Sequence, residues 1–217
     1  MLRFSPVLAD GERCTILCFG AHGDDIEIGC GGTLLRLIES GGPITCHWVV
    51  ATSTPERERE CRRSADLFLA GAARSEVVTW RFRDGYLPYL GGEVKDAFEG
   101  LKREISPDIV FTHYRGDLHQ DHRLINDLTW NTFRDHLILE YEVPKYDGDF
   151  RSPNLYVPLS ETQCQRKVDY LLECYATQRT HRWFTGETFR SVLRLRGVEA
   201  ASASGYAEGF YAHKLTW

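Results

Sequence analysis

Two short segments of the sequence concentrate side chains that bind divalent metals and move protons. The first lies within residues 20–32 and the second within residues 117–122, and their members are His22, Asp24, Asp25, His119, Asp121 and His122. Carboxylates and imidazoles packed this closely are costly in a folded chain unless they are solvated, paired or bound to a cation. Histidine and aspartate are also ligands that suit zinc. The two segments therefore predict a zinc centre.

The spacing predicts which side chains hold the ion. A catalytic zinc usually has three protein ligands and keeps one position for water. His22 and Asp25 are three residues apart, so one turn can direct both to a single ion, and His122 would supply the third ligand. The side chain of Asp24 points away from its neighbour Asp25, so we expect Asp24 to be the base that activates the zinc-bound water. Fe²⁺ or another divalent ion would also fit, since affinity alone does not select the metal.

The second segment also offers a group for the substrate. His119 lies three residues before His122 and is expected to reach the reacting oxygen of the substrate. A protonated imidazole there would stabilise the oxyanion, and loss of one such donor typically costs about 10²–10³ in rate. Asp121 is expected to hold His119 and keep it charged, because a nearby anion raises the pKa of a histidine.

Both segments follow predicted strands. Apolar runs at residues 14–19 and 109–112 precede the first and the second segment. In open α/β sheets, binding sites lie at the carboxyl ends of the strands. We therefore expect the two segments to face one another, provided that the two strands lie close together in the sheet.

The remaining elements alternate over the first half of the chain. Further strands are predicted at residues 44–51, 77–82 and 137–143, and residues 206–215 are either a strand or irregular. Helices are predicted at residues 31–40, 55–70, 94–105 and 188–196, and from the capping box at Ser160 and Gln163 towards residue 176. Alternation of strand and helix predicts an α/β fold with a mostly parallel sheet and helices on both faces.

Composition limits the class of protein. The 217 residues are enough for one domain spanning residues 1–217, and no apolar stretch approaches the about 20 residues of a membrane span. A formal net charge of −5 argues against a nucleic-acid partner. The seven cysteines are odd in number and form no CxxC pair, and the first residues do not form a signal peptide. These features predict a cytoplasmic protein with reduced thiols.

The two segments resemble the signatures of a known family. The first reads Ala21-His22-Gly23-Asp24-Asp25 with Gly31-Gly32 after it, and the second reads His119-Gln120-Asp121-His122. Both resemble the motifs of the PIG-L/LmbE-like zinc-dependent N-deacetylases, although Gly23 stands where proline is usual. Further matching pieces are Arg57-x-x-Glu60, Ser64-Ala65, Pro107-Asp108 and Ala207-Glu208-x-Phe210. The resemblance extends over nearly the whole chain.

The resemblance implies a Rossmann-like fold and a function. It implies hydrolysis of the N-acetyl group of an N-acetylglucosamine-type sugar or sugar conjugate, with a small-molecule amino-sugar substrate and a zinc cofactor. It also implies the same roles for the metal ligands, for the base Asp24 and for the oxyanion-stabilising His119. Arg57 is a candidate for positioning substrate hydroxyls or an anionic group, with a solvated helix charge as its alternative. The sequence leaves the oligomeric state open, a homo-oligomer included.

Other interpretations of the same residues remain. The chain could be a metal-dependent amidase acting on a non-sugar N-acyl substrate, or a non-catalytic sugar-binding relative. Nucleotide binding is disfavoured because the glycine run contains neither GK[ST] nor a complete GxGxxG. The roles of Glu27, His113 and Glu208 are open between structure and site, and the polar loops 84–93 and 142–156 are expected to shape the pocket.

Overall fold

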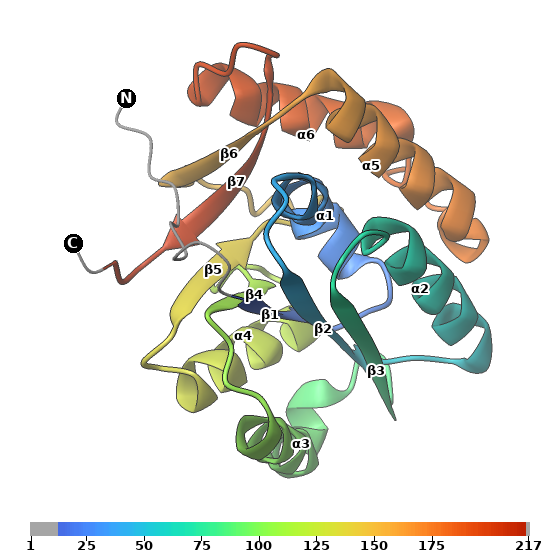
Figure 1. Cartoon of the computed structure of the whole chain (residues 1–217). Helices are drawn as coiled ribbons and strands as arrows, with labels where there is room; N and C mark the ends of the chain where they lie inside the picture. Colours follow the sequence, from blue (N-terminus) through green and yellow to red (C-terminus); the bar gives the residue numbers. More distant parts are fainter. Residues whose placement is uncertain (1–12, 216–217) are drawn as a thin grey trace.

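The computed structural model describes residues 13–215 and shows a seven-stranded sheet in the order β3-β2-β1-β4-β5-β7-β6 (Figure 1). The strands are β1 (Cys14–Gly20), β2 (Ile44–Thr52), β3 (Arg74–Phe82), β4 (Ile109–His113), β5 (Leu137–Tyr141), β6 (Leu155–Leu159) and β7 (Tyr206–Ala212). Strands β1 to β5 pair in parallel, whereas β7 is antiparallel to both β5 and β6. The predicted α/β fold with a mostly parallel sheet is confirmed.

Helices cover both faces of this sheet (Figure 1). They are α1 (Asp25–Glu39), α2 (Pro55–Phe68), α3 (Gly91–Glu104), α4 (Gln120–Thr132), α5 (Glu161–Cys174) and α6 (Gly186–Glu199), with short 3₁₀ turns η1 (Leu87–Leu90) and η2 (Ala176–Gln178). One core cluster joins the sheet to α1, α2 and α5, and a second joins its other face to α3 and α4. Successive side chains of a strand point to opposite faces, so Cys18 belongs to the first cluster and Phe19 to the second.

Helix α1 begins earlier than predicted. The glycine run suggested that the helix starts at residue 31, but it starts at Asp25 and includes Gly29 and Gly31. A Cβ atom at Gly29 would lie 2.0 Å from the ring of Tyr141, and one at Gly31 would lie 2.6 Å from the ring of Phe68. Glycine is therefore present because α1 packs closely on its neighbours. The earlier start places Asp25 in the first turn of the helix.

Two elements were not predicted. Helix α4 was missed because buried polar residues such as Asn126 and Thr129 obscure its apolar face. Strand β6 contains Pro158, which cannot donate a backbone hydrogen bond, and it is tolerated because β6 is an edge strand. The predicted capping box at Ser160 and Gln163 is confirmed at the start of α5.

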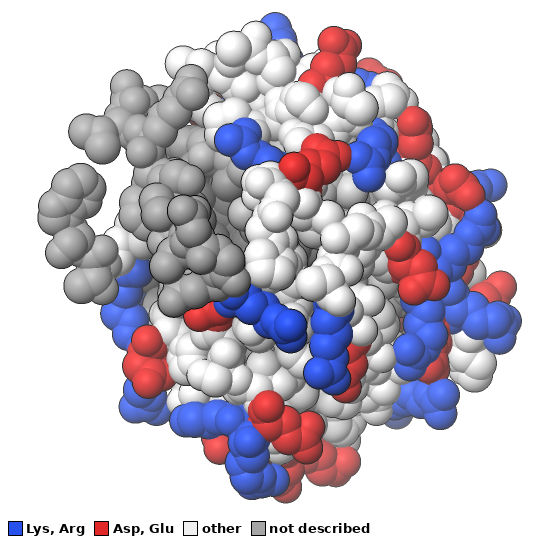
Figure 2. Space-filling model, viewed as in Figure 1, with Lys and Arg blue, Asp and Glu red and all other residues white. Residues whose placement is uncertain are grey.

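The cysteines lie in the interior, and charged side chains of both signs lie on the surface. All seven cysteines are free and buried. On the face drawn in Figure 2, basic and acidic side chains are interspersed and form no basic stripe. Within residues 13–215, no helix is both long and apolar enough to cross a membrane.

Candidate metal centre

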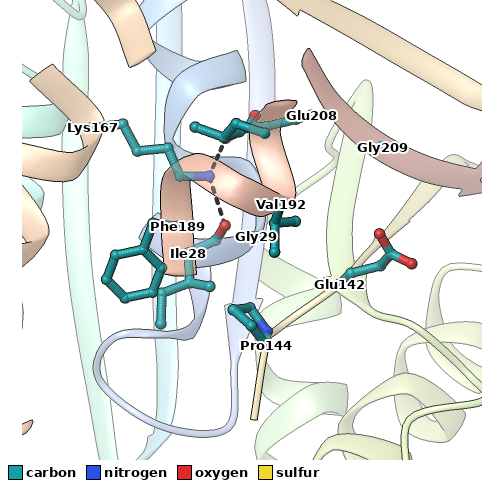
Figure 3. A pocket seen from close by; sticks show the side chains of 10 residues that line it. Ile28, Gly29, Glu142, Pro144, Lys167, Phe189, Val192, Glu208 and Gly209 are labelled. Carbon is teal, nitrogen blue, oxygen red and sulfur yellow. Dashed lines mark hydrogen bonds and ion pairs between the residues drawn. The ribbon is translucent and has the colours of Figure 1, made fainter. Parts of the chain in front are cut away.

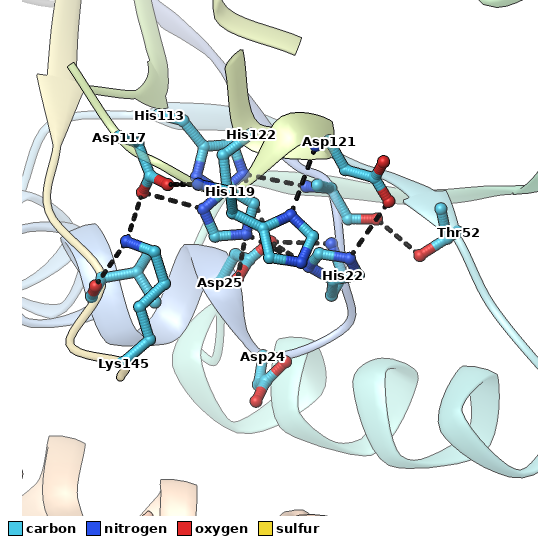
Figure 4. A network of polar contacts seen from close by, with 12 residues as sticks. His22, Asp24, Asp25, Thr52, His113, Asp117, His119, Asp121, His122 and Lys145 are labelled. Atoms are coloured by element: carbon cyan, nitrogen blue, oxygen red, sulfur yellow. Dashed lines mark hydrogen bonds and ion pairs between the residues drawn. The ribbon is translucent and has the colours of Figure 1, made fainter. Parts of the chain in front are cut away.

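The sheet brings the two segments together. Strands β1 and β4 are parallel neighbours, with Ile16 opposite Ile109 and Cys18 opposite Phe111, so their carboxyl ends meet at one edge. The first segment follows β1 and leads into α1, whereas the second precedes α4, of which His119 is the N-cap. The side chains of the two segments converge there (Figure 4).

The three predicted ligands lie in contact with one another. The Nδ1 atom of His22 is 3.2 Å from Nε2 of His122 and 3.3 Å from Oδ2 of Asp25. The Nε2 atom of His122 is 3.5 Å from Oδ1 of Asp25. Ligand atoms placed tetrahedrally about 2.0–2.1 Å from a zinc ion would be about 3.3 Å apart. The three side chains are therefore close enough to share one ion, and overlapping groups that could hold an ion also include His119 and His113.

The protonation state of His122 suits a metal ligand. Its Nδ1 atom lies 2.9 Å from Oδ2 of Asp117, and a carboxylate only accepts, so Nδ1 carries the proton. Burial and the neighbouring His113 lower the pKa of His122 to about 3, so the ring is neutral. The lone pair on Nε2 therefore faces His22 and Asp25.

Two further carboxylates lie at the far nitrogen of His22. Its Nε2 atom is 3.1 Å from Oδ1 of Asp84 and 3.5 Å from Oδ2 of Asp121. Burial alone would lower the pKa of His22, but Asp25 and these two carboxylates raise it well above its usual value. Carboxylates at the second nitrogen of a ligand histidine orient its ring. Asp84, with a side chain 69% exposed, begins the loop 84–93 that was expected to shape the pocket, but the sequence analysis did not single it out.

Asp24 faces away from the imidazoles (Figure 4). It occupies the N-cap position of α1 without a side-chain cap hydrogen bond, so helix capping does not explain it. Its Oδ1 atom lies 2.6 Å from Nη2 of Arg57, whose side chain is only 20% exposed. Arg57 is therefore a largely buried partner of Asp24 and not a solvated helix charge. Burial raises the pKa of Asp24 although the charge of Arg57 opposes this, and a raised pKa suits a general base.

The expected pairing of Asp121 with the His119 ring is wrong. The carboxylate of Asp121 accepts hydrogen bonds from the backbone N–H groups of Gly85 and Leu87 and lies near His22. Residues two apart at a helix start point in different directions, so its side chain turns away from His119. The carboxylate of Asp121 thus connects the loop after β3 to His22.

His119 also differs in charge from the expectation. Its Nδ1 atom accepts a hydrogen bond from the backbone N–H of Asp121 at 3.3 Å, which leaves the proton on Nε2. Burial and the charge of His22 lower the pKa of His119. The side chain is therefore a neutral donor through Nε2 and not the protonated imidazole that the sequence suggested.

His113 supports the site from inside the protein. It is the last residue of β4 and is fully buried. Its Nε2 atom accepts a hydrogen bond from the backbone N–H of Ala21 and lies 3.2 Å from Oδ2 of Asp25. Its ring stacks on that of His122 with 3.8 Å between centroids. His113 therefore packs beneath the metal residues.

Glu27, a residue of α1, and Glu208, on β7, are both buried. The Tyr175 hydroxyl contacts both the Glu27 carboxyl group and the Gly23 carbonyl, and burial raises the pKa of Glu27 to about 8. Glu208 pairs with Lys167, whose ammonium also donates to the Ile28 carbonyl, beside a small cavity (Figure 3).

Comparisons with known proteins agree with this arrangement. The sequence profile of the family described as PIG-L, GlcNAc-PI de-N-acetylase, matches residues 17–133. The chain is 32% identical over 146 residues to the uncharacterized deacetylase YaiS of Escherichia coli K12, covering 61% of this chain and 76% of that protein.

Solved structures share the fold. An N,N'-diacetylchitobiose deacetylase from Pyrococcus horikoshii is similar with a TM-score of 0.64 and 22% identity, over 91% of this chain and 83% of that one. GalB, the 4-carboxy-2-hydroxymuconate hydratase from Pseudomonas putida KT2440, is similar with a TM-score of 0.76 and 18% identity, over 94% and 98% of the two chains. A hydratase and a deacetylase thus share this fold, which by itself does not determine the reaction.

Proposed function

Since this chain belongs to the GlcNAc-PI de-N-acetylase (PIG-L) family, we propose that it is a zinc-dependent hydrolase that removes the N-acetyl group from an N-acetylglucosamine-type sugar or sugar conjugate. The observation that carries the proposal is the convergence of His22, Asp25 and His122, whose nearest ligand atoms are 3.2–3.5 Å apart. Asp24 adjoins Asp25 in the sequence, and its carboxylate contacts Arg57. Two imidazoles, each able to bind a metal in its neutral form, and one carboxylate make a set of ligands that suits zinc.

Each side chain of the proposed site has a separate role in amide hydrolysis. A zinc ion held by the three ligands would polarise the acetamide carbonyl and acidify the attacking water. Asp24 accepts the proton of that water and later delivers it to the leaving amine. The Nε2–H group of His119 donates to the oxygen that becomes negatively charged in the transition state. The products are acetate and a free amino sugar.

Arg57 serves two purposes in this proposal. One nitrogen of its guanidinium holds Asp24, and a guanidinium has five N–H donors, so others remain for substrate hydroxyls or an anionic group. The exposed carboxylate of Asp84, next to His22, can accept hydrogen bonds from the same sugar. Both groups lie beside the metal ligands, where the substrate would bind.

Acetate release tests the proposal. Purified protein loaded with zinc would be incubated with a panel of N-acetylated sugars and, in parallel, with non-sugar N-acyl amides, each with and without a chelator. We expect acetate from at least one amino sugar, lost on chelation and restored by zinc. Hydrolysis confined to the non-sugar amides would instead support the alternative amidase, and chelator-resistant hydrolysis would contradict the metal assignment.

A further inference from the structure

A lysine with a largely buried side chain lies close to the proposed metal ligands, in the segment between β5 and β6. The side chain of Lys145 is 9% exposed, and its ammonium has three acceptors: Oδ2 of Asp117 at 2.9 Å, Oδ2 of Asp149 at 2.5 Å and the Val143 carbonyl at 3.4 Å (Figure 4). An ammonium has three donors, so every donor has a partner. Such a fully satisfied buried group is rigid.

Asp117 connects this lysine to the metal ligand His122. Its Oδ2 atom is shared between Nζ of Lys145 and Nδ1 of His122, both at 2.9 Å, and its Oδ1 atom accepts the backbone N–H of His119 at 2.8 Å. Lys145, the His122 ring and a backbone N–H group all donate to Asp117, which therefore acts as an acceptor only, as a carboxylate does. One carboxylate thus orients the ligand ring and the start of α4.

Asp149 is the second carboxylate that binds Lys145. Its Oδ2 atom accepts from Lys145 and also from the backbone N–H of Leu118 at 2.8 Å. The lysine is therefore bound to both sides of the turn at residues 117–119. If its charge were removed, two buried carboxylates would lie close together without a cation and would repel each other.

We infer that Lys145, which lies outside the family match at residues 17–133, is a positioning residue that holds the ring of His122 in its metal-binding orientation through Asp117. This inference rests on the proposed function only in that the site must bind zinc. Partners of metal-ligating histidines typically change metal affinity by about 10–100-fold when they are removed.

Zinc affinity and a cadmium signal test this inference without measuring activity. The dissociation constant for zinc would be measured by competition with a chromophoric chelator, and ¹¹³Cd NMR of the cadmium-loaded protein would report the ligand geometry. We expect Lys145→Met to bind zinc about 10–100-fold more weakly and to shift the ¹¹³Cd signal. Lys145→Arg should recover most of the affinity, because it retains the charge.

The test includes a control variant and a second variant of the same network. Lys95→Met removes a lysine of α3 that pairs with Glu99 and with Thr132, the last residue of α4, at the opposite end of that helix from His122. This variant should bind zinc within threefold of the wild type. If Lys145→Met does not fold, the zinc affinity of Asp149→Asn is measured in its place. Weaker zinc binding by this variant supports the inference, and unchanged binding overturns it. Wild-type affinity and an unchanged ¹¹³Cd signal in folded Lys145→Met would also overturn it. A wild-type protein that binds no zinc would instead refute the proposed function.

Discussion

Replacing Glu208 should destabilise the fold strongly. Its Oε1 atom accepts from the Gly32 N–H at 2.8 Å and from Nζ of Lys167 at 2.5 Å, and its Oε2 atom accepts from the Thr33 N–H at 2.7 Å. Glu208→Leu removes these interactions together with the hydrogen bond from the Thr33 hydroxyl, and it leaves the Lys167 ammonium buried with only the Ile28 carbonyl. Breaking a buried ion pair by removing one partner costs about 3–5 kcal/mol.

The magnitude can be checked in two ways. A loss of about 4 kcal/mol in a chain of this size should lower the melting temperature by about 8–16 °C. Urea unfolding followed by circular dichroism gives the free energy directly. The double variant Lys167→Met/Glu208→Leu should be more stable than the single variant, because it contains no unpaired charge.

Two results would contradict this reasoning. If Glu208→Leu unfolds within about 1 kcal/mol of the wild type, the buried pair is not needed to hold α1 against α5 and β7. If the double variant is less stable than the single one, the unpaired ammonium is not the source of the loss. Either result would return Glu208 to the list of candidate site residues.

Three further predictions concern the site and the helix that carries it. Asp24→Asn should lower kcat by about 10²–10⁴ while the bound zinc is retained, as measured by steady-state kinetics and metal analysis, and near-normal turnover would exclude Asp24 as the base. Gly29→Ala places a Cβ atom 2.0 Å from the Tyr141 ring and should cost about 1–3 kcal/mol, whereas Gly100→Ala, with open space around it in α3, should not destabilise the protein in the same melting assay. Zinc at about 100 times its dissociation constant should stabilise the wild type by about 2.7 kcal/mol, and His122→Ala should abolish that thermal shift; an equal shift in the variant would place the ion elsewhere.

The convergence of the three proposed metal ligands was predictable because their chemistry is local. His22 and Asp25 are close in sequence, His122 follows a second apolar strand, and parallel neighbouring strands end at the same edge of a sheet. Residue type, spacing and sheet topology were thus sufficient to bring together side chains 100 positions apart. The order of the strands was needed to confirm that the two segments meet.

The partners of these residues could not be predicted, because they depend on tertiary packing. Lys145 is a single lysine in a loop and has no local signature, and Asp84 becomes a site residue only because Asp121 binds the backbone of the same loop. The direction of the Asp121 side chain depends on where α4 begins, which the sequence pattern did not reveal. The start of α1 was misplaced because a glycine run usually indicates a loop, whereas close packing on Tyr141 requires glycine here.

An anomalous difference map from crystals of the zinc-loaded protein, recorded at the zinc edge, tests the metal centre most directly. We predict one strong peak bonded to Nδ1 of His22, Nε2 of His122 and a carboxylate oxygen of Asp25, with Asp24 unbound beside it. A peak coordinated by other residues, or fully zinc-equilibrated crystals with no peak between these three side chains, would contradict the proposed catalytic site.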